Sequence, residues 1–311
     1  MPELKSERHH WWPECVSEHW KGTDGCVTWV SPDGKERRAP PKNFGVIGNG
    51  HHVKLGRGKP TVWDHSFEAQ FQKADDNFPA VIAWLDGLER DWVADANSRR
   101  DRFLAQPASD DIVSLLVECI VSLAVRSPRF RERAVAVAEH LRGPLPEQER
   151  NSLIAMNMRN SQRVVADSIR VHGKFAVLFS PKREFIFGDG FYSTLTAPAD
   201  APNSPKMLVP ITPHISVLYA RPNSYGTNPK LVTMVVSDDE AKGLNDAVQV
   251  YAKDFIFYRS EKPELTEPFQ QRQHLMYADP AHPIERLIDA IPGVPPRNKA
   301  LDNLIRRSPR R

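Results

Sequence analysis

The stretch that decides the fold is HGKFAVLFSPKREFIF, residues 172–187. At His172-Gly173 the pattern changes from apolar residues every three to four positions, typical of amphipathic helices, to short continuous apolar runs, typical of buried strands. Runs of the second kind also lie at residues 215–219, 231–236 and 255–258, between clusters of Pro, Gly, Asn and Asp. The pattern therefore predicts a helical part before this point and a strand-rich part after it.

Four segments before this point carry the helical pattern. They span residues 66–92, 110–125, 130–141 and 147–171. A further helix is expected from Ser237 to about residue 251, because a serine followed by acidic residues meets the unpaired N–H groups of a first helical turn.

Two turns with proline predict hairpins. Ser31-Pro32-Asp33-Gly34 follows an apolar run at residues 26–30, and residues 180–183 separate the runs at 175–179 and 184–187. Proline presets the second position of a β-turn, and glycine accepts the dihedral angles at its end.

The resulting fold prediction is α+β. It combines an N-terminal extended or hairpin segment, a helical middle layer, and a C-terminal mixed or antiparallel sheet with covering helices. We expect an N-terminal strand to return to that sheet and the first three segments to form one domain. The predicted boundaries give residues 1–65 as the extended segment, 66–172 as helical, 173–260 as strand-rich and 261–311 as a Pro-rich, basic tail.

The composition is that of a soluble globular protein. The chain has 311 residues, 40% hydrophobic and 26% charged, with a mean hydropathy of −0.49. Its longest nearly apolar run, residues 112–125, is shorter than the roughly 20 residues that span a bilayer. The first residues lack the apolar stretch of a secretory signal, and three cysteines cannot form a disulfide framework. These features predict a cytoplasmic protein without a membrane segment.

The positive charge is concentrated at the C-terminus. The chain has a net charge of +3, and its last 15 residues contain one acid, Asp302, and six basic residues: Arg297, Lys299, Arg306, Arg307, Arg310 and Arg311. Such a tail can contact phosphates, so nucleic acid is its predicted partner, although a solvated chain end is the simpler interpretation.

Several catalytic signatures are missing, including GxGxxG, GxxxxGK[ST], HExxH, GxSxG and CxxC. Nucleotide-binding, zincin and α/β-hydrolase functions therefore lose their strongest support. What remains is a group of metal-ligand residue types near the N-terminus, which can suit zinc, manganese or magnesium. Its members are His9, His10, Cys15, His19, Cys26, His51, His52, Asp64 and His65. Adjacent histidines in a strand point to opposite faces, so one of each pair is expected to serve one site.

Asp189 is the second candidate. It ends an apolar run and lies between Gly188 and Gly190, where a carboxylate can project from the end of a sheet. An aspartate that hydrogen-bonds its own turn is the alternative.

Six short motifs occur in an order that resembles the domain-of-unknown-function family 4238, over about residues 9–259. They are His9-His10-Trp11-Trp12-Pro13, Trp63-Asp64-His65-Ser66-Phe67-Glu68, Arg126-Ser127-Pro128, Glu184-Phe185-Ile186-Phe187-Gly188-Asp189, Leu208-Val209-Pro210-Ile211-Thr212-Pro213 and Leu244-Asn245. The chain departs from the family pattern at Gly188, where serine is usual, at Phe191, where proline is usual, and at Ser127, where threonine is usual. The resemblance implies that His9, His10, Arg126 and Asp189 matter, without implying an activity.

The leading hypothesis is a metal-dependent phosphodiesterase or nuclease-type hydrolase. In this hypothesis Asp189 holds a divalent ion (Mn, Mg or Zn) with Glu68 or Asp64 as a second carboxylate. His10 or His9 serves as ligand or general base, and Arg126 neutralises phosphate charge.

Two other functions stay open. One is a non-catalytic interaction or sensor module in which Arg126 and Asp189 form a buried ion pair, with Arg129 and Arg131 on a solvated helix start. The other is nucleic-acid binding by the tail, with bases stacking on Trp11, Trp12 or Trp29.

Overall fold

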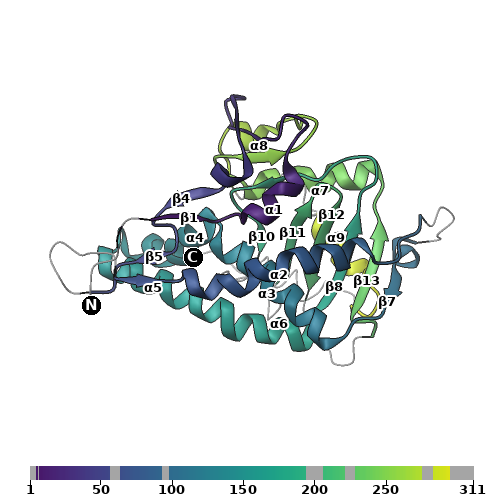
Figure 1. The fold of residues 1–311 in the computed structure, drawn as a ribbon, viewed down its shortest axis with the longest axis horizontal. Helices are drawn as coiled ribbons and strands as arrows, with labels where there is room; N and C mark the ends of the chain where they lie inside the picture. Colours follow the sequence, from purple (N-terminus) through teal and green to yellow (C-terminus); the bar gives the residue numbers. More distant parts are fainter. Residues whose placement is uncertain are drawn as a thin grey trace.

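A computed structural model describes residue 5 and residues 7–56, 64–92, 98–193, 206–220, 228–274 and 283–294. Within these ranges the protein has an α+β fold, as predicted. Its centre is a mixed sheet with helices on both faces (Figure 1). None of the described helices is both long and apolar enough to cross a membrane.

The central sheet has six strands in the order β10-β11-β12-β8-β13-β7. Neighbouring strands are antiparallel except for β8 and β13, which are parallel. The strands are β7 (Leu104–Gln106), β8 (Lys174–Phe179), β10 (Tyr192–Ser193), β11 (Lys206–Thr212), β12 (Ile215–Ala220) and β13 (Leu231–Val235). Every residue of β8 and β12 is buried. Burial of both faces explains why these strands read as continuous apolar runs rather than as an alternating pattern.

The helices before β8 form one layer. They are α2 (Glu68–Asp86), α3 (Asp110–Arg126), α4 (Pro128–Arg142), α5 (Glu147–Asn160), a π-helical turn η4 (Ser161–Val165) and α6 (Ala166–His172). The N–H group of Ile112 donates to the side chain of Ser109, and that of Phe130 donates to the side chain of Ser127. These serine caps set where α3 and α4 begin.

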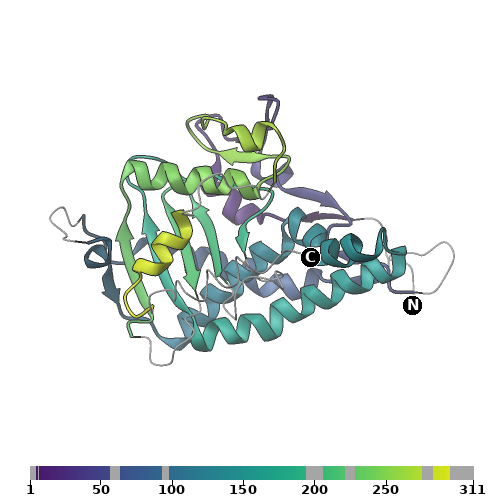
Figure 2. The same cartoon turned by 180° about the vertical axis from the view of Figure 1, so that it is seen from behind.

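Two helices cover the opposite face of the sheet (Figure 2). They are α7 (Asp238–Tyr251) and α9 (Pro283–Ala290), and the short α8 (Glu267–Gln270) contacts α7. The side chain of Ser237 accepts from the N–H of Glu240, whose carboxylate accepts from the N–H of Ser237. This capping box confirms the predicted helix start.

A second sheet has the order β3-β2-β14-β9. Its strands are β2 (Val27–Val30), β3 (Glu36–Ala39), β9 (Phe187–Gly188) and β14 (Ile256–Tyr258). The pairing of β2 with β3 confirms the first predicted hairpin. The second predicted hairpin is wrong, because β9 pairs with β14 and not with β8. The aromatic ring of Phe187 stacks on Trp12 at 4.0 Å between centroids, and this burial draws β9 away from β8.

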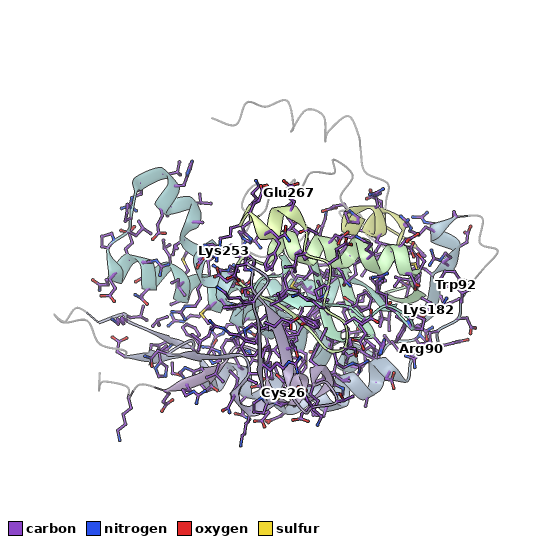
Figure 3. The ribbon with its side chains drawn as sticks, turned by 90° about the horizontal axis from the view of Figure 1, so that it is seen from above. Cys26, Arg90, Trp92, Lys182, Lys253 and Glu267 are labelled. Carbon is purple, nitrogen blue, oxygen red and sulfur yellow. The ribbon has the colours of Figure 1, made fainter. Side chains whose placement is uncertain are left out.

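Two small sheets complete the described strands. β1 (Arg8–His10) pairs with β4 (Val46–Gly48), and β5 (His52–Val53) pairs with β6 (His65–Ser66). The expected return of an N-terminal strand to the main C-terminal sheet is wrong for the described residues before Ser66, because β2 pairs with the C-terminal β14 in the second sheet and the histidine-bearing β1 pairs with β4. Short helical turns are α1 (Glu14–Ser17), η1 (Glu18–Trp20), η2 (Pro41–Asn43) and η3 (Arg99–Arg102). Buried apolar side chains from the helical layer and from the two larger sheets form one cluster, whereas Trp92 lies at the outer edge (Figure 3).

Candidate metal centre

Three buried imidazoles lie together where β1, β5 and the N-terminus of α2 meet. His9, His51 and His52 are each at most 3% exposed. The ring of His9 stacks on that of His51 at 4.9 Å and lies edge-on to that of His52 at 4.4 Å. Figure 1 shows β1, β4, β5 and α4 at one end of the molecule.

Two carboxylates border these rings on their solvent side. Oε2 of Glu7 lies 3.6 Å from Nε2 of His9 and 3.9 Å from Nε2 of His52. Oε2 of Glu68 lies 3.9 Å from Nε2 of His9 and is hydrogen-bonded to Nδ1 of His51. The side chains of Glu7 and Glu68 are 62% and 48% exposed, so the imidazoles form the floor of the site and the carboxylates form its open side.

Three of these side chains could hold a metal ion: Glu7, His9 and His52 offer ligand atoms that all lie within 4.8 Å of one another. Bonds of about 2.0–2.2 Å to a single ion place ligand atoms roughly 3–4 Å apart. Nε2 of His9 is buried and has no hydrogen-bond partner among the described residues. A buried ring nitrogen of this kind is available to bind a metal ion.

Burial favours the uncharged form of two of these imidazoles, His51 and His52. It lowers the pKa of His51 to about 4, against the opposing effect of Glu68. Burial and the neighbouring His9 also lower the pKa of His52. Burial is the largest single effect on the pKa of Glu68 and would raise it, but the hydrogen bond from His51 and the charge interactions with His51, His9 and Arg126 together lower it. At neutral pH the site therefore presents neutral imidazoles at His51 and His52 and a charged carboxylate at Glu68, the forms that bind metal ions.

Asp189 is not part of this group. Its Oδ2 accepts from Nε and Nη2 of Arg129, at 3.0 and 2.9 Å, and from the N–H of Asp254 at 3.1 Å. Its Oδ1 accepts from the N–H of Lys253, a residue labelled in Figure 3, at 2.8 Å. None of its bonds within the described chain is to His9, His10 or Arg126. Asp189 is therefore held by a cation and two backbone donors and lies outside the described group that could hold a metal ion, so its convergence with the histidines stays a prediction.

Arg129 is the buried partner of Asp189, so its expected place on a solvated helix start is also wrong. Its side chain is 6% exposed and also pairs with Asp254 and Glu132. Arg126 is buried too, but its guanidinium binds Asp75 through Nη1 at 3.1 Å and Nη2 at 2.5 Å. The predicted Arg126–Asp189 pair is thus replaced by two separate pairs, and Asp75 leaves Arg126 little capacity to bind a phosphate.

The other predicted ligands lie outside the three-residue group. His10 points to the other side of β1, where its Nε2 lies 3.2 Å from the carbonyl oxygen of Lys42. This confirms the expected alternation within the His9-His10 pair. Oδ1 of Asp64 accepts from the N–H of Leu55 at 2.8 Å. Trp63 and the basic residues of the tail lie outside the described residues.

Glu7 was missed by sequence reasoning. It precedes His9 by two positions, the spacing that puts side chains on one face of an extended chain. His51 and His52 both join the cluster, because His51 lies in the turn before β5 and escapes the alternation of a strand.

One well-formed cavity belongs to another part of the protein. It has a volume of about 200 Å³ and is lined by residues that include Asn245, Gln249 and Tyr258. Asn245 and Gln249 are each held by two backbone groups, and the hydroxyl group of Tyr258 donates to Glu36. These buried side chains serve packing, whereas in the histidine cluster the buried Nε2 of His9 has no hydrogen-bond partner within the described chain.

Comparisons with protein-family models, with curated proteins and with solved structures found no match. The resemblance to family 4238 therefore stays a prediction.

Proposed function

We propose that this protein is a metal-dependent hydrolase whose ion is held by Glu7, His9 and His52. The observation that carries the proposal is the buried Nε2 of His9, which has no hydrogen-bond partner among the described residues and lies 3.6 Å from the carboxylate of Glu7 and 3.9 Å from that of Glu68. Two imidazoles and one carboxylate are a ligand set of catalytic zinc sites and also suit manganese. Such an ion, when bound, activates water as a nucleophile and polarises the substrate.

Glu68 is the general base in this proposal. Its carboxylate is near His9 but does not belong to the group of three ligands, so it can accept a proton at the edge of the site. His51 donates to Glu68 and orients it, since the neutral imidazole of His51 has its Nδ1 toward the carboxylate.

Metal binding requires a change of tautomer at His9. The backbone N–H of His51 donates to Nδ1 of His9 at 3.4 Å. The proton of the His9 ring is therefore on Nε2 when no ion is bound. With an ion on Nε2, the proton of the His9 ring would be on Nδ1, and the long hydrogen bond from the backbone N–H of His51 would be lost. A single long hydrogen bond contributes little against a metal–nitrogen bond.

The proposed substrate class is the phosphodiester, with RNA or DNA as candidates and the tail residues 297–311 as a contact for phosphates. Arg126 no longer supports this class, because Asp75 neutralises it.

The test uses protein stripped of metal with a chelator. Zn²⁺, Mn²⁺ and Mg²⁺ are added one at a time, and the melting temperature, bound metal and hydrolysis of RNA, DNA and bis(p-nitrophenyl) phosphate are measured. Glu7→Gln should abolish metal binding without loss of the fold, since its side chain is largely exposed, and Glu14→Gln is the matched exposed control. Glu68→Gln should keep the metal and lose hydrolysis. Absence of metal binding by the wild type would refute the proposal.

The non-catalytic module is the second candidate. It is favoured by the two buried ion pairs, Arg129–Asp189 and Arg126–Asp75, which occupy residues expected to be catalytic. Under this function the ion raises the melting temperature of the wild type, while none of the phosphodiesters is hydrolysed.

A further inference from the structure

One arginine beside the histidine cluster, Arg131, pairs with no acidic residue of the described chain. Arg131 of α4 donates from Nη1 to the carbonyl oxygen of Gly50 at 2.6 Å and from Nη2 to that of His52 at 3.2 Å. Among the described residues these two carbonyl groups are its hydrogen-bond partners, and no carboxylate pairs with it. Burial and the nearby Arg150 lower its pKa to about 10.

Burying a cation without a counter-ion costs folding free energy, which its hydrogen bonds must offset. The two carbonyl groups that Arg131 holds flank His51, so the guanidinium fork spans the peptide segment that carries His51 and His52. The planar fork of arginine fixes two acceptors at once, which the single ammonium group of lysine cannot do.

We propose that Arg131 is the positioning residue of the metal centre, holding the Gly50–His52 segment so that His52 reaches the ion and His51 reaches Glu68. This role rests on the proposed metal site. Arg131 acts through the backbone, as the partners that orient metal ligands in other proteins act through hydrogen bonds.

The charge of Arg131 by itself would weaken metal binding, whereas the positioning role strengthens it. Arg131 is a positive charge close enough to lower the pKa of His52, so it also disfavours a divalent ion there. If Arg131 were only a neighbouring charge, Arg131→Gln would strengthen metal binding and Arg131→Lys would leave it unchanged. If Arg131 positions the segment, Arg131→Gln weakens binding although a repulsive charge has been removed.

The experiment measures the affinity of chelator-stripped protein for Co²⁺ alone, with the visible absorption spectrum as a readout of coordination geometry. We expect Arg131→Gln to bind about 10- to 100-fold more weakly than the wild type. Arg131→Lys should fall in between, with an altered spectrum. Arg142→Gln is the matched control from the same helix, because Arg142 is exposed and pairs only with Glu149 among the described residues.

Equal or tighter binding by a folded Arg131→Gln protein would overturn the role of Arg131 and leave the proposed metal site intact. If Arg131→Gln does not fold, wild-type affinity and spectrum in Arg131→Lys would overturn it in the same way. Failure of the wild type to bind Co²⁺ would instead overturn the metal site itself, together with the role of Arg131.

Discussion

Substitution of Asp189, the buried partner of Arg129, separates an effect on folding stability from an effect on metal binding. Replacing Asp189 by Asn keeps the shape of the side chain but removes its charge and turns one acceptor into a donor. In the wild type the carboxylate of Asp189 accepts four hydrogen bonds of 2.8 to 3.1 Å, two from Arg129 and two from the N–H groups of Lys253 and Asp254. Asparagine can accept through only one oxygen, so at least one buried donor loses its partner.

The expected cost follows from this geometry. Breaking a buried ion pair by removing one partner costs about 3–5 kcal/mol. Asp254 remains beside Arg129 and keeps part of its charge compensated, so we expect the lower end, about 3 kcal/mol. Arg142→Gln breaks an exposed pair and should cost about 1 kcal/mol or less.

The assay is urea denaturation of both variants and the wild type, followed by metal titration of the folded proteins. We expect Asp189→Asn to lower the free energy of unfolding strongly and to leave metal affinity unchanged, because Asp189 makes no contact with Glu7, His9 or His52 in the described structure. A loss of stability no larger than that of Arg142→Gln would refute the ion-pair argument. Loss of metal binding in a folded Asp189→Asn protein would return Asp189 to the metal site.

Three further outcomes are expected. Lys174 is buried, and burial together with the charge of Arg100 lowers its pKa from 10.5 to about 8. Between these two pH values the unfolded chain binds more protons than the folded protein. The melting temperature should therefore rise with pH in this window relative to Lys174→Met, and parallel profiles would contradict the assignment. Gly190→Ala should destabilise the protein by more than about 1 kcal/mol in urea denaturation, because its methyl group would overlap the carbonyl oxygen of Tyr251 and the side chain of Arg129. Trp20→Phe should lower the urea midpoint by the equivalent of about 1 kcal/mol, since it deletes a buried hydrogen bond of 2.9 Å to the carbonyl oxygen of Ile211; an unchanged midpoint would show that this bond adds nothing.

The amino-acid sequence by itself determined the features that depend on near neighbours. The helix that begins after Ser237 follows from hydrogen bonds between Ser237 and Glu240, three residues apart. The hairpin of residues 27–39 follows from a four-residue turn. The change at His172-Gly173 from helices to strands could be predicted because hydrophobic periodicity is local.

Tertiary structure decided which distant residues meet. Arg126 and Arg129 lie in similar settings in the sequence, and only the packing of β9 against β14 and the burial of α4 selects Arg129 as the partner of Asp189. Likewise Glu7 meets His52 only in the folded protein, where β1 pairs with β4 and β5 pairs with β6 through residues 12 or more positions apart. Each such contact requires closing a long loop of chain, and its free energy is gained only when the whole core is buried around it. The choice of partner is therefore a property of the folded molecule, and no short stretch of sequence contains it.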